Sequence, residues 1–168
     1  MNYWLLADTH FGHTKLQELE GRPVDAETKI LKGLHCVPPW DVLIHLGDFS
    51  FTNDGDSCDK FFSNIESNAK VLLIRGNHDK HSVEWYTSRG FNIVLDRADI
   101  NMYGKRIAFT HEPLPWNDYS YDINIHGHLH RNNHRNIQTS SRHICICTEA
   151  PWSPVTLKRV IEQWQFNR

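Results

Sequence analysis

Near its centre the chain reads Val71-Leu72-Leu73-Ile74-Arg75-Gly76-Asn77-His78-Asp79, an apolar run that ends in a cluster of polar side chains. The apolar residues at its start have the length and composition of a buried β-strand. An amide, an imidazole and a carboxylate follow directly, and such groups bind metal ions or transfer protons. The stretch therefore predicts a strand whose carboxyl end carries chemistry.

The same pattern, an apolar run followed by a polar motif, occurs at four other places. The runs cover residues 3–7, 42–46, 106–109 and 123–125, and the motifs that follow them are Asp8-Thr9-His10, Gly47-Asp48, Thr110-His111 and Gly127-His128-Leu129-His130. In open α/β folds the carboxyl ends of the strands meet along one edge, where sites are built. We therefore expect all five motifs to lie together at one edge of a sheet.

The segments between these runs predict the rest of the fold. Residues 26–36 and 57–67 carry apolar side chains at helical spacing, so the first half predicts parallel strands joined by right-handed crossovers. In the second half, residues 100–109 predict a hairpin with Gly104 in its turn, and residues 143–147 a further strand. Residues 155–164 predict either a helix or a strand leading into one, and residues 113–122 a loop that acts as a substrate lid.

Composition limits the class of protein. The 168 residues show no internal repeat and no Gly/Ser linker, which predicts a single domain over 1–168. The net charge of −2 gives no strong nucleic-acid signature. No apolar run approaches the roughly 18 residues of a membrane span, no secretory leader is recognisable, and the cysteines lack CxxC spacing. We therefore expect a cytoplasmic protein that does not contact a membrane.

The donors in the five motifs are suited to transition-metal ions. Carboxylates and imidazoles favour Mn, Fe or Zn. Asp8 and His10 are one residue apart, so strand alternation would place both on the same face, and His128 and His130 repeat that spacing. The carboxylate of Asp48 has two oxygens and is able to bridge two ions.

In this order the motifs resemble those of the calcineurin-like metallophosphoesterase superfamily, whose signature runs Asp-x-His, Gly-Asp, Gly-Asn-His-Asp/Glu, His, Gly-His-x-His. The resemblance extends from Asp8 to His130, and the opening of the chain is similar to that of small bacterial and phage phosphoesterases. It implies an α/β fold: a metallophosphoesterase-type β-sandwich of two mixed sheets flanked by helices. It also implies a metal-dependent phosphoesterase with two divalent ions, Mn²⁺ expected and Fe, Zn, Ni or Mg as alternatives.

The resemblance also implies a role for each residue. The ligands of the first ion would be Asp8, His10, Asp48 and His130. The ligands of the second would be Asp48, Asn77, His111 and His128. A hydroxide bridging the ions would be the nucleophile, and His78 would protonate the leaving oxygen or stabilise the charged transition state.

Other residues beside the motifs are candidates for contacts with the substrate or the catalytic histidine. His13 and Arg131 are candidates to contact the substrate phosphate, and Asp79 or Asp54 to orient His78. After Gly47-Asp48 the chain lacks the Asp and Arg of the phosphoprotein-phosphatase branch, so activity of that kind is not expected.

The predicted function is hydrolysis of a small phosphate ester. A diester is favoured over a monoester because the short chain leaves little room for a cap and many small relatives hydrolyse diesters. Two alternatives stay open: a nuclease acting on single-stranded nucleic acid, and a non-catalytic scaffold that kept the fold. The sequence does not indicate an oligomeric state.

Overall fold

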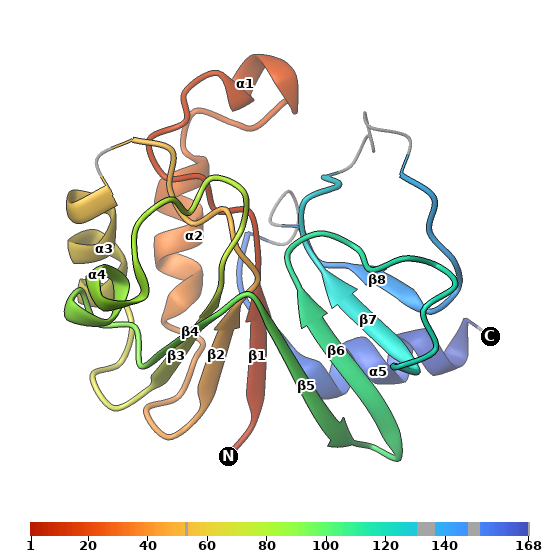
Figure 1. Ribbon diagram of the computed structural model, residues 1–168. Helices are drawn as coiled ribbons and strands as arrows, with labels where there is room; N and C mark the ends of the chain where they lie inside the picture. The colour runs from red at the N-terminus through yellow and green to blue at the C-terminus, as the bar shows by residue number, and fades with distance from the viewer. Residues whose placement is uncertain (53, 131–136, 148–151, 168) are drawn as a thin grey trace.

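The protein is described by a computed structural model that covers residues 1–52, 54–130, 137–147 and 152–167. Two β-sheets face each other (Figure 1). The first has the order β4-β3-β2-β1-β9, with β1 to β4 parallel and β9 antiparallel to β1. Its strands are β1 (Tyr3–Leu6), β2 (Val42–His45), β3 (Lys70–Ile74), β4 (Ile93–Leu95) and β9 (Val155–Thr156).

The second sheet has the order β5-β6-β7-β8, in which β5 and β6 are antiparallel and the other pairs are parallel. Its strands are β5 (Arg97–Met102), β6 (Lys105–Thr110), β7 (Ile123–His126) and β8 (His143–Cys145). The predicted hairpin is confirmed, since Tyr103 and Gly104 turn the chain with φ values of 54° and 68°. Both sheets are mixed, as expected.

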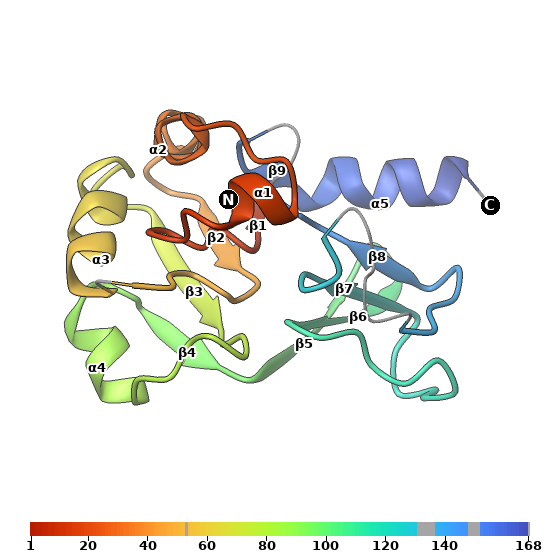
Figure 2. The same ribbon diagram turned by 90° about the horizontal axis from the view of Figure 1, so that it is seen from above.

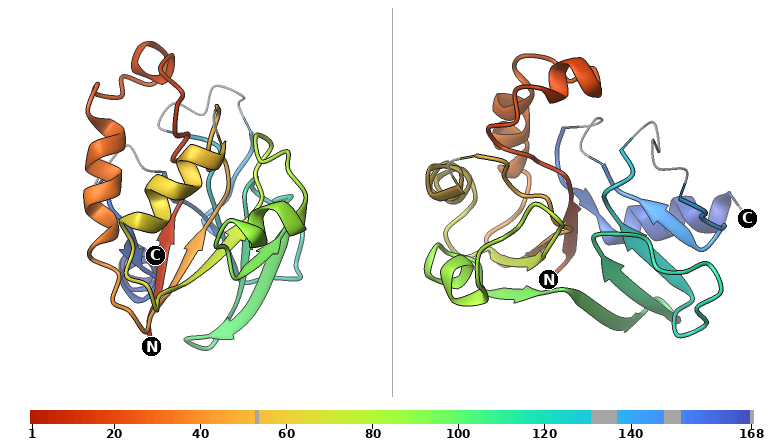
Figure 3. Two further views of the ribbon diagram at one scale, coloured as in Figure 1. Left: turned by 90° about the vertical axis from the view of Figure 1, so that its left-hand side faces the viewer. Right: turned by 45° about the horizontal axis from the view of Figure 1, so that its top comes forward.

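Helices flank the sandwich. The outer face of the first sheet is covered by α2 (Ala26–Leu34), α3 (Asp54–Ser63) and α4 (Val83–Ser88), which stand in front of it in the left view of Figure 3. After β9 the chain forms α5 (Leu157–Phe166), so the second of the two alternatives for this segment is confirmed. Figure 2 shows α5 along the side of the sandwich where β9 and β8 lie. No helix in the described part of the chain is long and apolar enough to cross a membrane.

Strand alternation divides the apolar side chains into two layers. Leu5 points between the sheets, where it packs with Ile44 and Phe109. Its neighbour Leu6 points the other way, against the layer that includes Ile30. Each such buried side chain contributes roughly 1.5–3 kcal/mol, so both faces of the first sheet are fixed and its strand ends are held in place.

The expected lid over the site is not formed. Because β6 and β7 are parallel, the chain must return from one end of the sheet to the other, and the connecting loop does so along the sheet's outer face. Asn124 on that face accepts a hydrogen bond from the Leu114 amide at 2.8 Å. The guanidinium of Arg142 donates to the carbonyl oxygens of Trp116 and Tyr121 at 2.7 and 3.0 Å. These bonds hold the loop against the sheet.

Candidate metal centre

All five motifs lie at the carboxyl ends of strands, at the upper edge of both sheets in Figure 1. The first sheet places Asp8 after β1, Asp48 after β2 and Asn77 after β3. The second places His111 after β6 and His128 after β7. The prediction that the motifs gather at one edge is therefore confirmed, and both sheets contribute to it. A short helix, α1 (Leu16–Leu19), lies beside this edge.

At three of the five motifs the ligand residues have a left-handed backbone, so strand alternation does not explain their side-chain directions. β1 ends at Leu6, and beyond it Asp8 and His10 have φ values of 54° and 46°. Asp48, His128 and His130 are also left-handed, with φ of 52°, 70° and 48°. Of the non-glycine residues with positive φ that the structure describes, all but Tyr103 and Trp152 are candidate ligands. Such strain costs roughly 1–3 kcal/mol per residue and persists only where the surroundings impose it.

Hydrogen bonds from neighbouring segments impose this conformation. The amides of Asp8 and His10 donate to the carbonyls of Gly47 and Asp48 at 2.9 and 3.0 Å. The buried guanidinium of Arg22 donates from Nη1 to the Thr9 carbonyl at 2.8 Å and from Nη2 to the Asp8 carbonyl. The left-handed turn is thus held from two sides.

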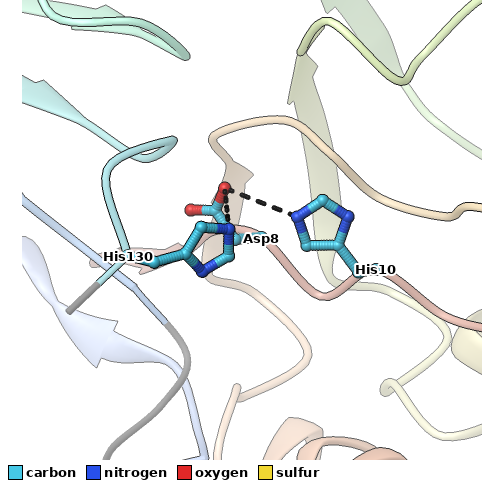
Figure 4. A group of neighbouring side chains, drawn as sticks. All are labelled: Asp8, His10 and His130. Atoms are coloured by element: carbon cyan, nitrogen blue, oxygen red, sulfur yellow. Dashed lines mark ion pairs between the residues drawn. The ribbon is translucent and has the colours of Figure 1, made fainter. Parts of the chain in front are cut away.

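The first group of donors is Asp8, His10 and His130, which Figure 4 shows converging. Asp8 Oδ1 lies 4.0 Å from His10 Nε2 and 3.9 Å from His130 Nε2. Asp48 Oδ2 lies 3.6 Å from His10 Nε2. Two ligand atoms that are each about 2.1 Å from one ion are at most about 4.2 Å apart, so these donors are close enough to share an ion.

The second group centres on His111 Nε2. This nitrogen lies 3.3 Å from Asp48 Oδ2 and 3.0 Å from His128 Nδ1. Asn77 Oδ1 lies 3.2 Å from it. On the other side of the ring, Nδ1 of His111 bonds the Leu46 carbonyl at 2.8 Å, an arrangement that orients a metal-ligating histidine. Asp48 Oδ2 therefore adjoins both groups.

The state of His10 fits a metal ligand. Both of its ring nitrogens are buried and have no hydrogen-bond partner among the residues that the structure describes, which is rare for a buried polar group unless it binds a ligand. Burial lowers the pKa of His10 to about 2, so the imidazole is neutral, as metal binding requires. The residues present therefore fit two divalent ions.

Comparison with known proteins agrees with this geometry. A family model of the calcineurin-like phosphoesterase superfamily domain matches residues 1–146. The chain belongs to this superfamily. Its members typically bind divalent metals, and the mixed α/β fold with two helix-flanked sheets is the metallophosphoesterase fold.

The individual proteins that are similar to this chain have low sequence identity to it. An uncharacterized protein of Methanocaldococcus jannaschii is 27% identical over 140 residues, covering 77% of this chain and 69% of that protein. The crystal structure of a protein of unknown function from Aquifex aeolicus has a TM-score of 0.76 and 25% identity, covering 96% of this chain and 98% of that one. A novel archaeal phosphodiesterase aligns with a TM-score of 0.49 and 17% identity, over 94% of this chain and 100% of that chain.

His78 lies at the rim of the centre. Its side chain is 37% exposed, and Nε2 lies 4.0 Å from Asp48 Oδ2. The ring packs against Phe51 and His10, with centroid distances of 5.2 and 5.5 Å. The backbone amide of His78 donates to Asp48 Oδ1 at 2.9 Å, which couples its position to the shared carboxylate.

Neither residue expected to orient His78 does so. The carboxylate of Asp79 accepts from the amides of Asp48, Phe49 and Gly76 at 2.9, 3.0 and 2.7 Å. Asp79 therefore holds the loop that carries Asp48. Asp54 pairs with His81 at 2.7 Å. Both expectations were wrong because the polar motif indicates which groups are present but not which amides they face.

Of the two residues expected to contact the substrate phosphate, the structure describes one. His13 lines the cleft in front of the first group, and its ring lies 3.9 Å from that of Phe51. Arg131 lies outside the described residues. The sequence did not identify Phe51 or Arg22 as residues of the site, because their contacts with the centre produce no pattern in the spacing of residues along the chain.

Besides His10, three ionisable groups of the centre have shifted pKa values. Burial raises the pKa of Asp8 to about 6. Burial also opposes a charge on His111, but the hydrogen bond to Asp48 and the charges of Asp8 and Asp48 outweigh it and raise the pKa of His111 to about 9. Although burial acts the other way, the hydrogen bond and charge of His111 hold the pKa of Asp48 well below its usual range. Without metal, His111 is therefore protonated and paired with Asp48 near neutral pH.

We expect metal affinity to rise with pH from about 6 to about 9. Binding must displace the His111 proton in this interval, so the apparent association constant increases by about tenfold per pH unit. Below about pH 6 the Asp8 proton competes as well and the dependence becomes steeper. Calorimetric titration with Mn²⁺ in buffers of different ionisation enthalpy measures both affinity and proton release. An affinity that does not change between pH 6 and 9 would contradict this.

We expect Arg22→Lys to weaken metal binding by about 10–100-fold, the usual effect of losing a partner that orients a ligand. One ammonium cannot reproduce the two directed bonds to the Asp8 and Thr9 carbonyls. Arg106→Lys is the matched control, since Arg106 pairs with Asp122 on the surface. Equal Mn²⁺ affinities for the two variants, measured by equilibrium dialysis, would exclude a role for Arg22.

Proposed function

We propose that this chain hydrolyses a small phosphate ester by means of two divalent ions and favours diesters over monoesters. One observation carries the proposal: Asp48 Oδ2 lies 3.6 Å from His10 in the first group and 3.3 Å from His111 in the second. A single carboxylate that adjoins two convergent donor groups supports a dinuclear centre and not two separate sites.

Each residue would have a defined task. The first ion would be held by Asp8, His10, Asp48 and His130, and the second by Asp48, Asn77, His111 and His128. When bound, such a pair supplies Lewis acidity for the phosphoryl oxygens and a water deprotonated near neutral pH. His78, exposed on the cleft side of Asp48, would protonate the leaving oxygen. Positioning and charge neutralisation account for most of the acceleration in phosphoryl transfer.

The donor set and the surroundings support the finer parts of the proposal. Imidazoles make up more than half of the donors, which favours Fe, Zn or Ni over Mg²⁺, while the carboxylate and amide oxygens also suit Mn²⁺, the ion we would supply first. Within the described residues the 113–122 loop lies away from the cleft, which leaves room for the second arm of a diester. A cytoplasmic location stays a prediction.

The test of the function is hydrolysis of bis-p-nitrophenyl phosphate by the purified chain loaded with Mn²⁺. We expect release of p-nitrophenolate that stops after chelation and returns when Mn²⁺ is restored. A metal-loaded protein that is inert towards every mono- and diester offered would refute the enzyme proposal. Elemental analysis distinguishes the hydrolase from the non-catalytic scaffold, because the scaffold is expected to hold no bound transition metal. Cleavage of single-stranded DNA in preference to small diesters would favour the nuclease.

A further inference from the structure

The candidate metal centre opens to solvent on two sides of Asn77. On one side is a cleft of about 170 Å³, whose lining includes His10, His13, His78 and Asn77. On the other side is an opening of about 290 Å³ lined by Arg75, Asn77, Asp96, Thr110, His111 and Glu112. Asn77 lines both, so the two openings meet at a residue of the candidate centre.

The sizes of these spaces bear on the substrate. Small-molecule sites usually measure roughly 300–1,000 Å³, and the cleft of about 170 Å³ falls below that range. Together with the second opening it reaches the range. A monoester has one organic arm and would use one space, whereas a diester has two arms and would use both.

The second opening is chemically distinct. Every residue that lines it is polar. Asp96 is balanced by Arg75, whose Nε and Nη2 lie 2.9 and 2.7 Å from Asp96 Oδ1. The Glu112 side chain is 57% exposed, and its carboxylate lies 4.0 Å from Nε2 of the buried His128. An exposed carboxylate therefore stands next to the second donor group.

The local fold keeps Glu112 in this place. The hydroxyl of Thr110 donates to the Glu112 carbonyl at 2.6 Å. Asn124 Nδ2 in turn donates to Thr110 Oγ1 at 2.9 Å. The backbone of Glu112 is thus tied through Thr110 to β7, and Glu112 lines the opening.

We propose that this second opening, which we call the Glu112 subsite, binds the non-leaving arm of a phosphodiester, and that this arm carries hydroxyl groups. The inference rests on the proposed function. His78 lines the first cleft, so the leaving oxygen departs there, and the arm that stays on phosphorus extends past Asn77 towards Glu112. Hydroxyl groups on the arm donate to the Glu112 carboxylate. An apolar arm would cover the same polar groups and leave them without hydrogen-bond partners, which is unfavourable.

Three substrates with the same leaving group test the subsite. They are p-nitrophenyl phosphate, phenyl p-nitrophenyl phosphate and 3,5-bis(hydroxymethyl)phenyl p-nitrophenyl phosphate, which have no second arm, an apolar arm and a hydroxylated arm whose hydroxyls cannot reach phosphorus to displace the leaving group by ring closure. For the unaltered chain we expect kcat/KM to be at least about tenfold higher for the hydroxylated diester than for the phenyl diester. Glu112→Met should lower kcat/KM selectively for the hydroxylated diester, so that the ratio between the two diesters falls to about one. Binding of glycerol 3-phosphate to the Mn²⁺-loaded protein, measured by calorimetry, should weaken in parallel.

Glu162→Met is the matched control, because Glu162 is an exposed glutamate of α5 far along the chain from the centre. The subsite is refuted if Glu112→Met changes all three substrates by the same factor, since Glu112 would then act through His128. It is also refuted if the unaltered chain does not prefer the hydroxylated arm. If the unaltered chain cleaves none of the three substrates, the proposed function itself fails, and the two failures are thereby distinguished.

Discussion

Asp48→Asn should reduce hydrolysis of bis-p-nitrophenyl phosphate by more than about 10³-fold. Removing a single electrostatic stabiliser from an active site costs about 10²–10³-fold, and Asp48 Oδ2 adjoins both donor groups of the candidate centre. An amide has nearly the same shape but lacks the charge that would hold two cations together. We expect bound Mn²⁺ to fall from about two ions per chain to one or none.

A control variant is needed to distinguish loss of the metal centre in Asp48→Asn from loss of the fold. Asp99→Asn makes the same chemical change at an exposed carboxylate of β5 that pairs with Arg97, and it should retain full activity and metal content. Circular dichroism should show both variants folded. Two tightly bound ions and unchanged turnover in Asp48→Asn would be incompatible with a dinuclear site that shares this carboxylate.

The clustering of the motifs was predictable because it follows from strand order. An apolar run that ends in a polar motif indicates both a buried strand and its carboxyl end, and parallel strands bring those ends together. Val71 to Ile74 and the residues after them illustrate this, since β3 ends at Ile74 and Asn77 lies at the centre. Each polar motif directly follows its own strand in the sequence, so a local pattern is sufficient to place it at the carboxyl end of that strand.

The directions of the side chains were not predictable in the same way. Alternation along a strand placed Asp8 and His10 on one face, but the strand has already ended and both residues are left-handed. What holds them is Arg22, together with the Gly47–Asp48 backbone, through bonds to main-chain atoms. Any residue type supplies main-chain atoms, so such contacts leave no mark on residue spacing.

The same limit explains the error over Asp79. Its place directly after His78 suggested that it orients that ring, yet its oxygens bond three backbone amides of other segments. Phe51 packs against His78 instead, from a loop that follows a different strand. A ring contact of this kind requires the fold to be known first.

His78→Ala should lower kcat by about 10²–10⁴-fold, the usual contribution of a positioned acid or base, while two ions remain bound. The side chain lies beside Asp48 but at the rim, and its link to Asp48 Oδ1 runs through the backbone amide, which alanine retains. The centre should therefore persist while proton transfer is lost. Mn²⁺ content by elemental analysis and kcat on a diester measure the two effects separately.

The dependence on leaving group distinguishes proton donation from a structural role. p-Nitrophenolate departs without a proton, whereas an alkoxide requires one, so the loss in His78→Ala should be at least about tenfold larger for an alkyl leaving group. Added imidazole should restore part of the activity on the alkyl ester. His81→Ala is the matched control, because His81 lies on the same loop and pairs with Asp54 away from the cleft. If His78→Ala slowed both esters equally and imidazole had no effect, His78 would stabilise charge or shape the cleft without donating a proton.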